Sequence, residues 1–488
     1  MLIGHPSLVP QIWPDDRFDV EWAFERDAGG TGFRFRQFLR GGRYGLELGR
    51  DADEERDPRR YPYPRDMTGT SAIPLLRNPI FARLWFIQAA NQVGGNMALY
   101  AMTILVFDTT RSNATVSALF ATYVVPQIAL SPFAGVVVDR LNLRWALVGP
   151  NVLRSVLMVG LALTGSNVPI LLALNLGVSL MSVALTPAEG SMIPRVVPPS
   201  QLATAMGIFN LTLQGSFALG FALIGPLLVT IFGPSEVLAV VAVLYIAATI
   251  ACIGLPSEPP VERPAGAPRR EAVMEPIREL GHGFGVVRRD REISRPIIHQ
   301  AAGAAMAGVV GVLGPALATT VGLQPDRLVV VVLPLGIGVV LGVLGLRRFD
   351  HVARRRAAEA GLLAFGGLTA SLALVSPLRG ALAAAGISVV PVLGGIALLA
   401  GAAYAVTSVS AQTALLESMP ADVRGRVFGV LASIVSTASL VPILVAGPLA
   451  DRISAPLVLV VVGVAVVLIA IWSARGFGPV RATRPSKG

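Results

Sequence analysis

The segment GVVVDRLNLR, from Gly135 to Arg144, places charged side chains between two long apolar runs. Charges beside such runs are costly unless they are paired or set the orientation of the chain in a membrane. Arg140 and Arg144 can set orientation, because that rule counts lysine and arginine and gives acids little weight. Asp139 therefore needs another explanation, such as a contact with a second helix.

A further basic residue, Arg154, follows about ten residues later, roughly 15 Å from Arg144 along a helix. An arginine this deep in an apolar run should face protein or a wet cavity. Two roles fit it equally well. It can bond neighbouring helices, or it can bind a substrate or take part in ion coupling.

Amide side chains cluster within three turns of the first apolar run, and their spacings of three, four and eight place them on one helix face. They are Gln88, Asn91, Gln92 and Asn96. Gly94 and Gly95 allow another helix to approach closely. A cavity wall and interhelical hydrogen bonding explain this row equally well.

Other polar side chains within apolar runs are cavity candidates on the same grounds, although each alone is more often a packing contact. They are Tyr123, Gln127, Asn210, Gln214, His299, Gln300, Tyr404 and Thr407. Tyr123 and Gln127, like Asn210 and Gln214, are four residues apart and share a face. His299 is expected near the cytoplasmic end, in contact with solvent.

The composition excludes several classes of function. The chain is 53% hydrophobic and 14% charged, against about 25% charged residues in soluble domains. Its net charge of +10 is spread over short loops without a basic face, which argues against nucleic-acid binding. The single cysteine, Cys252, excludes an internal disulfide, and no metal-ligand spacing or nucleophile–base pair is found. We expect no metal, no cofactor and no enzymatic activity.

The elements that must position these residues are apolar spans of about twenty residues, each long enough to cross a bilayer. They fall roughly at 82–107, 115–138, 145–164, 168–187, 202–231, 236–255, 297–320, 328–346, 358–376, 385–409, 426–450 and 455–474. The sequence thus predicts an all-α membrane protein with twelve transmembrane helices.

The loops between the spans differ in charge on alternate sides. One side holds Arg140, Arg144, Arg195, Arg347, Arg348, Arg354, Arg355, Arg356, Arg424 and Arg426, and the other only Arg111, Arg327, Arg379 and Arg452. Because basic loops stay in the cytoplasm, both termini are expected there.

Five parts of the chain follow from this pattern. Residues 1–75 form a polar extension, expected to be largely disordered with a small hairpin; translation starting at Met67 would instead remove most of it. Residues 76–255 and 296–475 are two six-span halves. Residues 256–295 form a linker with an amphipathic helix from about Ala272, expected on the cytoplasmic membrane face, and residues 476–488 form a cytoplasmic tail.

The two halves are related to each other. RVVPPSQLATAMGIF leads to a Gly-Pro-Leu triplet at Gly225, and ESMPADVRGRVFGVL leads to the same triplet at Gly447. Pro198 and Pro420 differ by the same 222 positions as the two glycines. Internal repeats that meet at a central cavity are typical of secondary transporters.

These features resemble the major facilitator superfamily, whose loop between spans two and three reads G-x-x-x-D-R-x-G-R-R/K. Asn142 and Leu143 depart from that pattern, and asparagine tolerates the left-handed backbone that glycine would supply. RNPIFARLWFIQAANQVGG, ELGHGFGVVRRDREISRP, TPAEGSMIPRVVPPSQLATAMGIFN and MPADVRGRVFGVLASIVSTASLVPILVAGPLADR resemble exporters of the enterobactin and macrolide efflux type. The resemblance covers about residues 75–475.

The resemblance implies a cytoplasmic gate in which the Asp139 carboxylate meets the N-terminus of span eleven, near Arg426. A helix N-terminus carries partial positive charge and unpaired N–H groups, so the contact is sound physically. The implied gating residues are Gly135, Asp139, Arg140, Arg144 and Arg426. Glu189, Arg195, Glu417 and Asp422 are expected to form gate pairs where spans four and ten end.

We therefore expect a monomeric transporter in the cell membrane that exports a small, moderately hydrophobic compound by alternating access, such as a drug, a siderophore or a metabolite. Lipid or lysolipid transport, which suits a cavity poor in fixed charge, and a membrane sensor or scaffold are the alternatives. No carboxylate is found inside spans one to six. Proton coupling through Glu189, His299 or Asp139 and uncoupled transport therefore both stay open.

Overall fold

The computed structural model describes residues 20–26, 33–39, 72–138, 140–257, 291–346, 354–418 and 424–475. The chain divides into two units, Met1–Arg65 and Asp66–Gly488. In the first unit, strand β1 (Val20–Arg26) pairs antiparallel with strand β2 (Phe33–Leu39). The hairpin expected in the N-terminal extension is therefore present.

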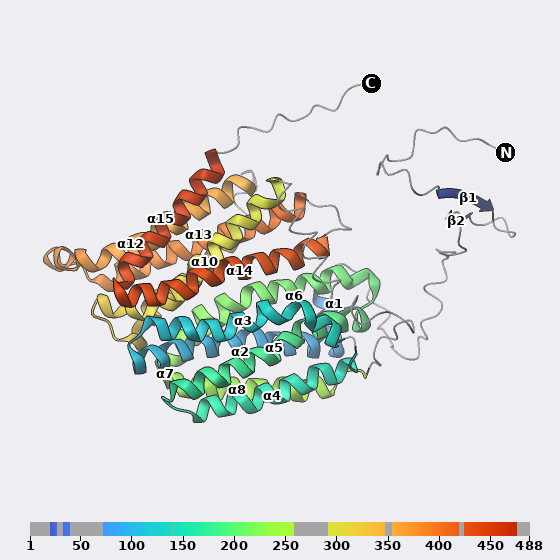
Figure 1. Ribbon diagram of the computed structural model, residues 1–488, viewed down its shortest axis with the longest axis horizontal. Helices are drawn as coiled ribbons and strands as arrows, with labels where there is room; N and C mark the ends of the chain where they lie inside the picture. The colour runs from blue at the N-terminus through green and yellow to red at the C-terminus, as the bar shows by residue number, and fades with distance from the viewer. Residues whose placement is uncertain are drawn as a thin grey trace, which may run out of the picture. The chain divides into compact units, whose positions relative to one another are not determined.

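The described part of the second unit is helical throughout. Its first half contains α1 (Ala72–Arg77), α2 (Pro79–Thr110), α3 (Asn113–Val138), α4 (Leu143–Leu163), α5 (Val168–Val196), η3 (Pro199–Gln201), α6 (Leu202–Ser216), the π-helical η4 (Phe217–Ile224), α7 (Gly225–Phe232) and α8 (Pro234–Ile253). Its second half contains α10 (Arg291–Thr320), η5 (Pro325–Leu328), α11 (Val329–Gly345), α12 (Arg354–Ala384), α13 (Val389–Ser418), α14 (Arg424–Arg452) and α15 (Ala455–Arg475). In Figure 1 the blue to green helices gather in one bundle and the yellow to red helices in another.

Ten of these helical segments are long and apolar enough to cross a membrane, with α6, η4 and α7 forming one continuous segment. Helix α11 is a shorter apolar helix, and α2 has 32 residues but carries the amide row, which lowers its mean hydropathy. With these two, the described residues contain twelve helical segments that correspond to the predicted spans, six on each side of the linker. The predicted all-α fold with two related six-helix halves is confirmed.

Asparagine side chains begin three helices of the first half. Asn78 accepts hydrogen bonds from the backbone N–H groups of Ile80 and Phe81, and Asn167 accepts one from Ile170. Asn142 accepts one from Arg144 with φ −60° and ψ 126°. The reason we gave for Asn142, a left-handed backbone, is therefore wrong. This asparagine is an N-cap in extended conformation, a role that asparagine fills well.

Helix α5 is longer than the fourth apolar span predicts. The span was expected to end at residue 187, but the helix continues to Val196 and contains both Pro187 and Pro194. A proline removes one backbone hydrogen bond, and packed neighbours in a membrane bundle tolerate that loss. Glu189 consequently lies inside a helix and is 4% exposed, rather than in a connecting loop.

The halves meet along two seams and share one apolar core. Helix α3 packs against α14, and η4 and α7 pack against α11. Phe221 of η4 meets the rings of Tyr100 and Phe120 edge-on, with centroids 5.4 and 6.4 Å apart, and Gly311 of α10 lies against Phe120. Aromatic pairs in this geometry stabilise a core beyond their buried area.

Candidate functional site

A polar cavity of about 250 Å³ lies inside the first half. Its walls come from α2, α3, α4, α5, α6 and α8, and α14 of the second half adds Ser436. The polar side chains that line it are Asn91, Gln92, Tyr123, Gln127, Arg154, Asn175, Ser182, Thr186, Glu189, Tyr245 and Ser436. Five of the predicted substrate residues, Asn91, Gln92, Tyr123, Gln127 and Arg154, therefore share one cavity.

Arg154 is 4% exposed and is held by Tyr245 of α8. Its Nη2 donates to the Tyr245 hydroxyl at 2.5 Å, and the guanidinium carbon lies 4.2 Å from the ring centroid. The Tyr245 hydroxyl in turn donates to the backbone oxygen of Asn91 at 3.3 Å. Arg154 thus bonds neighbouring helices and also lines the cavity, while its Nε finds no hydrogen-bond partner within the described residues. The structure shows the helix-bonding role, and the role in substrate binding or ion coupling stays a prediction.

Glu189 gives the same cavity a carboxylate, which corrects the expectation that spans one to six contain none. The side chain is buried, and its Oε1 has no hydrogen-bond partner among the residues that the structure describes. An acid and a base of opposite formal charge, Glu189 and Arg154, therefore line one buried space. Burying both is costly unless they interact or serve function.

The amide row of α2 separates into two groups. Gln88 donates to the backbone oxygen of Phe209 at 3.0 Å, and Asn96 donates to Ser216 at 3.2 Å, so these two bind α6. Asn91 and Gln92 line the cavity instead. Neither amide atom of Asn91 makes a hydrogen bond within the described part of the chain. Sequence spacing placed all four on one face, but this face is wide enough to meet both a helix and a cavity.

The other polar side chains on α3 and α5 hold these helices together as well as lining the cavity. Gln127 donates to the backbone oxygen of Ser179 at 3.4 Å, and Asn175 donates to Thr122 at 2.9 Å. Tyr123 faces the cavity beside them.

A second polar cavity, of about 180 Å³, lies in the second half. His299, Gln300, Tyr404 and Thr407 line it, as do Ser408 and Val435. Val435 and Ser436 are neighbours on α14, so this helix contributes to both cavities. All four predicted residues of the second half therefore come together.

His299 is 2% exposed and forms a 2.9 Å hydrogen bond with Ser473 of α15. We expected it to be solvated near the cytoplasmic end, which is wrong. Helix α10 begins at Arg291, so His299 lies two turns inside it and faces α15.

A smaller, apolar cavity of about 60 Å³ adjoins the second one through Tyr404. Phe217 and Phe221, stacked 4.9 Å apart on η4, line it together with Phe365 of α12. Residues four apart on a helix share one face, which lets these rings stack.

The predicted gating residues are only partly described. Gly135 lies in α3, Arg140 is exposed in the turn after it, and Arg144 is half-buried in the first turn of α4. Arg426 lies in the first turn of α14, where only the backbone is described, and Asp139 and Asp422 lie outside the described residues. The cytoplasmic gate therefore stays a prediction, and the linker helix expected from Ala272 also lies outside the described residues.

Two candidates lie apart from these cavities. Asn210 is exposed on α6, and only the backbone of Gln214 is described. The sequence reasoning missed Glu189 and Tyr245 as cavity residues. Glu189 is preceded by twenty-one residues, 168–188, of which only Asn175, Ser179, Ser182 and Thr186 are polar, a pattern that a helix passing through Pro187 would continue.

The sequence matches the Major Facilitator Superfamily over residues 84–442. An uncharacterized MFS-type transporter of Mycobacterium bovis is 31% identical over 153 residues, which cover 29% of this chain and 35% of that protein. One from Mycobacterium tuberculosis has the same identity and coverage. The chain therefore spans about a third of the length of these curated relatives.

Solved transporter structures share the fold. The nucleoside transporter NupG superposes with a TM-score of 0.62 at 11% identity, covering 81% of this chain and 98% of that one. A bacterial homolog of the human lysosomal transporter Spinster gives 0.57 at 15% identity, covering 81% and 95%. At identities this low, the superpositions establish a common fold and give no information about the substrate.

Proposed function

The chain belongs to the major facilitator superfamily, and from that premise we propose that it exports a small, moderately hydrophobic compound by alternating access. The polar cavity with Arg154 and Glu189 is the observation that supports this proposal. It lies between helices of the first half and is met by Ser436 of the second, so relative motion of the halves changes its walls. A drug, a siderophore or a secondary metabolite fits the proposed class of substrate.

Glu189 is the proposed proton-coupling group. It is buried, it faces the cavity, and one of its carboxylate oxygens is unbonded within the described residues. A carboxyl group in such a place can exchange its proton for substrate, because the charged form is costly when no cation or ligand compensates it. Arg154, held by Tyr245, is the nearby fixed charge that such an exchange requires.

Export is tested by accumulation of a panel of labelled drugs and siderophores in cells with and without the gene. Deletion is expected to raise accumulation of at least one compound, and a protonophore is expected to remove the difference. Asp139→Asn should abolish export if the cytoplasmic gate works as proposed. Equal accumulation across the whole panel, with the protein present in the membrane, would argue against export.

Coupling is tested by Glu189→Gln in inverted membrane vesicles, with Glu236→Gln as the matched control because Glu236 is an exposed acid in the first turn of α8. Gradient-driven uptake should be lost in Glu189→Gln, while exchange of labelled for unlabelled substrate should persist. Loss of both activities in a folded protein would contradict a coupling role, and so would retention of gradient-driven uptake.

Lipid transport is the second candidate, favoured by the apolar cavity lined by Phe217, Phe221 and Phe365. The first-half cavity was expected to be poor in fixed charge, and with Arg154 and Glu189 it is not. Movement of a labelled lysolipid in proteoliposomes, without movement of soluble dyes, would favour this candidate over export.

The chain is a multi-pass membrane protein. We propose that it acts as a monomer in the cell membrane. We also propose that both termini lie in the cytoplasm, because the arginine-rich loops of the sequence are on the side where the first span begins and the last span ends. Antiport of protons and a part in multidrug resistance belong to the same proposal.

A further inference from the structure

The two halves are joined by a carboxylate at the remote face, the end of the bundle where α2 ends and α3 begins. Asp451, in the last turn of α14, contacts the start of α3 in the other half. Its Oδ1 accepts from the backbone N–H and from the side-chain amide of Asn113, both at 2.8 Å. Its Oδ2 accepts from the Ser112 hydroxyl at 2.8 Å and from the Ala114 N–H at 3.0 Å.

These bonds complete the N-terminus of α3, whose first N–H groups have no partners within the helix. Asp451 takes the N–H groups of Asn113 and Ala114. The hydroxyl oxygen of Ser112 accepts a hydrogen bond from the N–H of Thr115 at 3.3 Å. The backbone oxygen of Ser112 accepts one from the N–H of Val116 at 3.4 Å. Half of the capping of α3 therefore comes from a helix of the other half, and the partial positive charge of the helix end favours the carboxylate.

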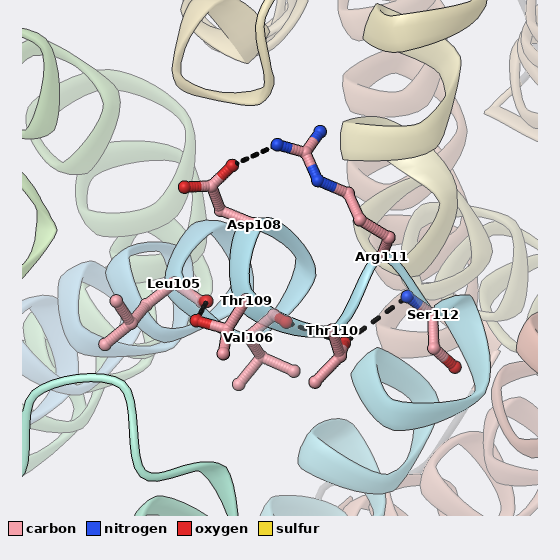
Figure 2. A network of polar contacts seen from close by, with 7 residues as sticks. All are labelled: Leu105, Val106, Asp108, Thr109, Thr110, Arg111 and Ser112. Atoms are coloured by element: carbon pink, nitrogen blue, oxygen red, sulfur yellow. Dashed lines mark hydrogen bonds and ion pairs between the residues drawn. The ribbon is translucent and has the colours of Figure 1, made fainter.

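The turn before α3 makes two further polar contacts of its own. Figure 2 shows this turn: Arg111 pairs with Asp108 at 2.7 Å, and the N–H of Ser112 donates to the Thr110 hydroxyl at 3.3 Å. Arg111 has φ 52°, the left-handed conformation in which many helices end, and it is the C-cap of α2.

Next to this cap, α14 lies directly against α3. The Ser117 hydroxyl donates to the backbone oxygen of Ile443 at 2.6 Å and accepts from the N–H of Gly447 at 3.2 Å. A Cβ at Gly447 would collide with the backbone oxygen of Asn113. The Gly-Pro-Leu triplet of the second half thus permits the contact that brings Asp451 to α3.

The internal repeat relates the interface between α3 and α14 to the interface between α7 and α11, and only the first of these has the carboxylate contact among the described residues. The offset of 222 positions that relates the halves places Val229, a buried residue of α7, where Asp451 stands in α14. The corresponding seam, between α7 and α11, is therefore apolar at this position. Only the seam between α3 and α14 carries the carboxylate cap among the described residues.

We propose that Asp451 is a positioning residue of the transport cycle that reversibly closes the remote face, which is the outer face in the orientation proposed above. The proposal rests on alternating access but not on the direction or substrate of transport. Asp451 is solvent-exposed, and the free energy of an exposed helix cap is small. Such a bond can bias the closed state and still break in every cycle.

The test measures a distance between the halves at that face. Spin labels at Ser166→Cys and Ala385→Cys, two exposed turn residues on opposite halves, are placed in full-length protein carrying Cys252→Ser, and pulsed paramagnetic resonance gives their distance distribution. Asp451→Ala should raise the ratio of long to short distances by roughly fivefold to tenfold. Ser112→Ala should add little in the Asp451→Ala background, because the two share one bond.

Glu236→Ala is the matched control, since it removes an exposed acid in the first turn of α8 at the same face, and it should leave the distribution unchanged. Asp451→Asn, which keeps one acceptor oxygen, should give a smaller shift and serves if Asp451→Ala fails to fold. If the parent shows both a long and a short distance, and neither Asp451 variant changes their ratio, the proposed role of Asp451 is overturned. A single distance in the parent and in every variant would contradict alternating access itself.

Discussion

At the scale of single residues, one tyrosine links three helices around the charged cavity. Tyr245 of α8 accepts from Arg154 of α4 and donates to the backbone of Asn91 of α2. Gly94 and Gly95 leave room for this side chain: a Cβ at Gly94 would lie 3.2 Å from the Tyr245 ring, and one at Gly95 would lie 3.1 Å from its hydroxyl oxygen. The position of the Arg154 guanidinium thus depends on Tyr245, and the position of Tyr245 depends on the absence of side chains at Gly94 and Gly95.

Tyr245→Phe keeps the ring under the guanidinium and removes the hydroxyl. We expect the free energy of unfolding to fall by about 1.5–3 kcal/mol, as for a hydrogen bond to a charged group, with reduced transport. Thermal unfolding in detergent and vesicle uptake measure the two effects. Tyr123→Phe is the control, because Tyr123 lines the same cavity without a hydrogen bond to Arg154. Equal losses of the free energy of unfolding in both variants would contradict the structural role of the Tyr245 hydroxyl.

The buried pair of His299 and Ser473 belongs to packing between α10 and α15 as much as to the second cavity. Ser473→Ala is expected to lower the free energy of unfolding by about 1 kcal/mol and leave substrate affinity unchanged. Thermal unfolding and substrate competition separate the two readouts. A change in affinity alone would place Ser473 in the binding site instead.

At the scale of elements, glycines let α11 and α13 touch through their backbones. A Cβ at Gly338 would collide with the backbone of Leu398, and one at Gly401 with the backbone of Leu335. Small residues at such crossings allow the close van der Waals packing that drives helix association in membranes. Packing this close fixes the rotation of both helices, and with it the direction in which Tyr404 and Thr407 point.

Gly401→Ala is expected to destabilise the protein by about 1–3 kcal/mol, because the backbone of α11 cannot move aside without shifting the helix. Gly395→Ala, on the same helix with nothing near its Cβ position, should be neutral or stabilise by roughly 0.5–1 kcal/mol. The melting temperatures of the two variants, measured in one detergent, test this difference in stability. Equal melting temperatures would mean that α11 and α13 do not meet as closely as described.

At the scale of the whole molecule, the helical unit Asp66–Gly488 contains both polar cavities and both seams between the halves. The unit Met1–Arg65 contains the hairpin of β1 and β2. Transport by rocking of two halves needs only the helical unit, whereas a sensor or scaffold would use the extension as an interaction arm.

Deletion of residues 1–66 is therefore expected to leave export within about twofold of the full chain at equal membrane abundance, since no proposed site lies there. Compound accumulation in cells, normalised to protein level, measures this. Complete loss of function with normal abundance would favour the sensor or scaffold over the exporter.

The architecture was predictable from the sequence because span length and hydrophobicity are local properties set by the bilayer. The twelve segments, the two halves and the shared face of Tyr123 and Gln127 followed from apolar runs, helical spacing and the repeat. The site was predictable only in part. Glu189 was placed in a loop because prolines are read as helix ends, and His299 was placed in solvent because its distance from the end of α10 was underestimated.

What the tertiary structure alone decided is which side chains meet. Sequence spacing gives the face of a helix but not its rotation against its neighbours, and rotation separated Gln88 and Asn96 from Asn91 and Gln92. It also joined Asp451 to the start of α3, more than three hundred residues away in the chain. Such contacts depend on close backbone packing at sites such as Gly447, a property of two helices together that neither one encodes by itself.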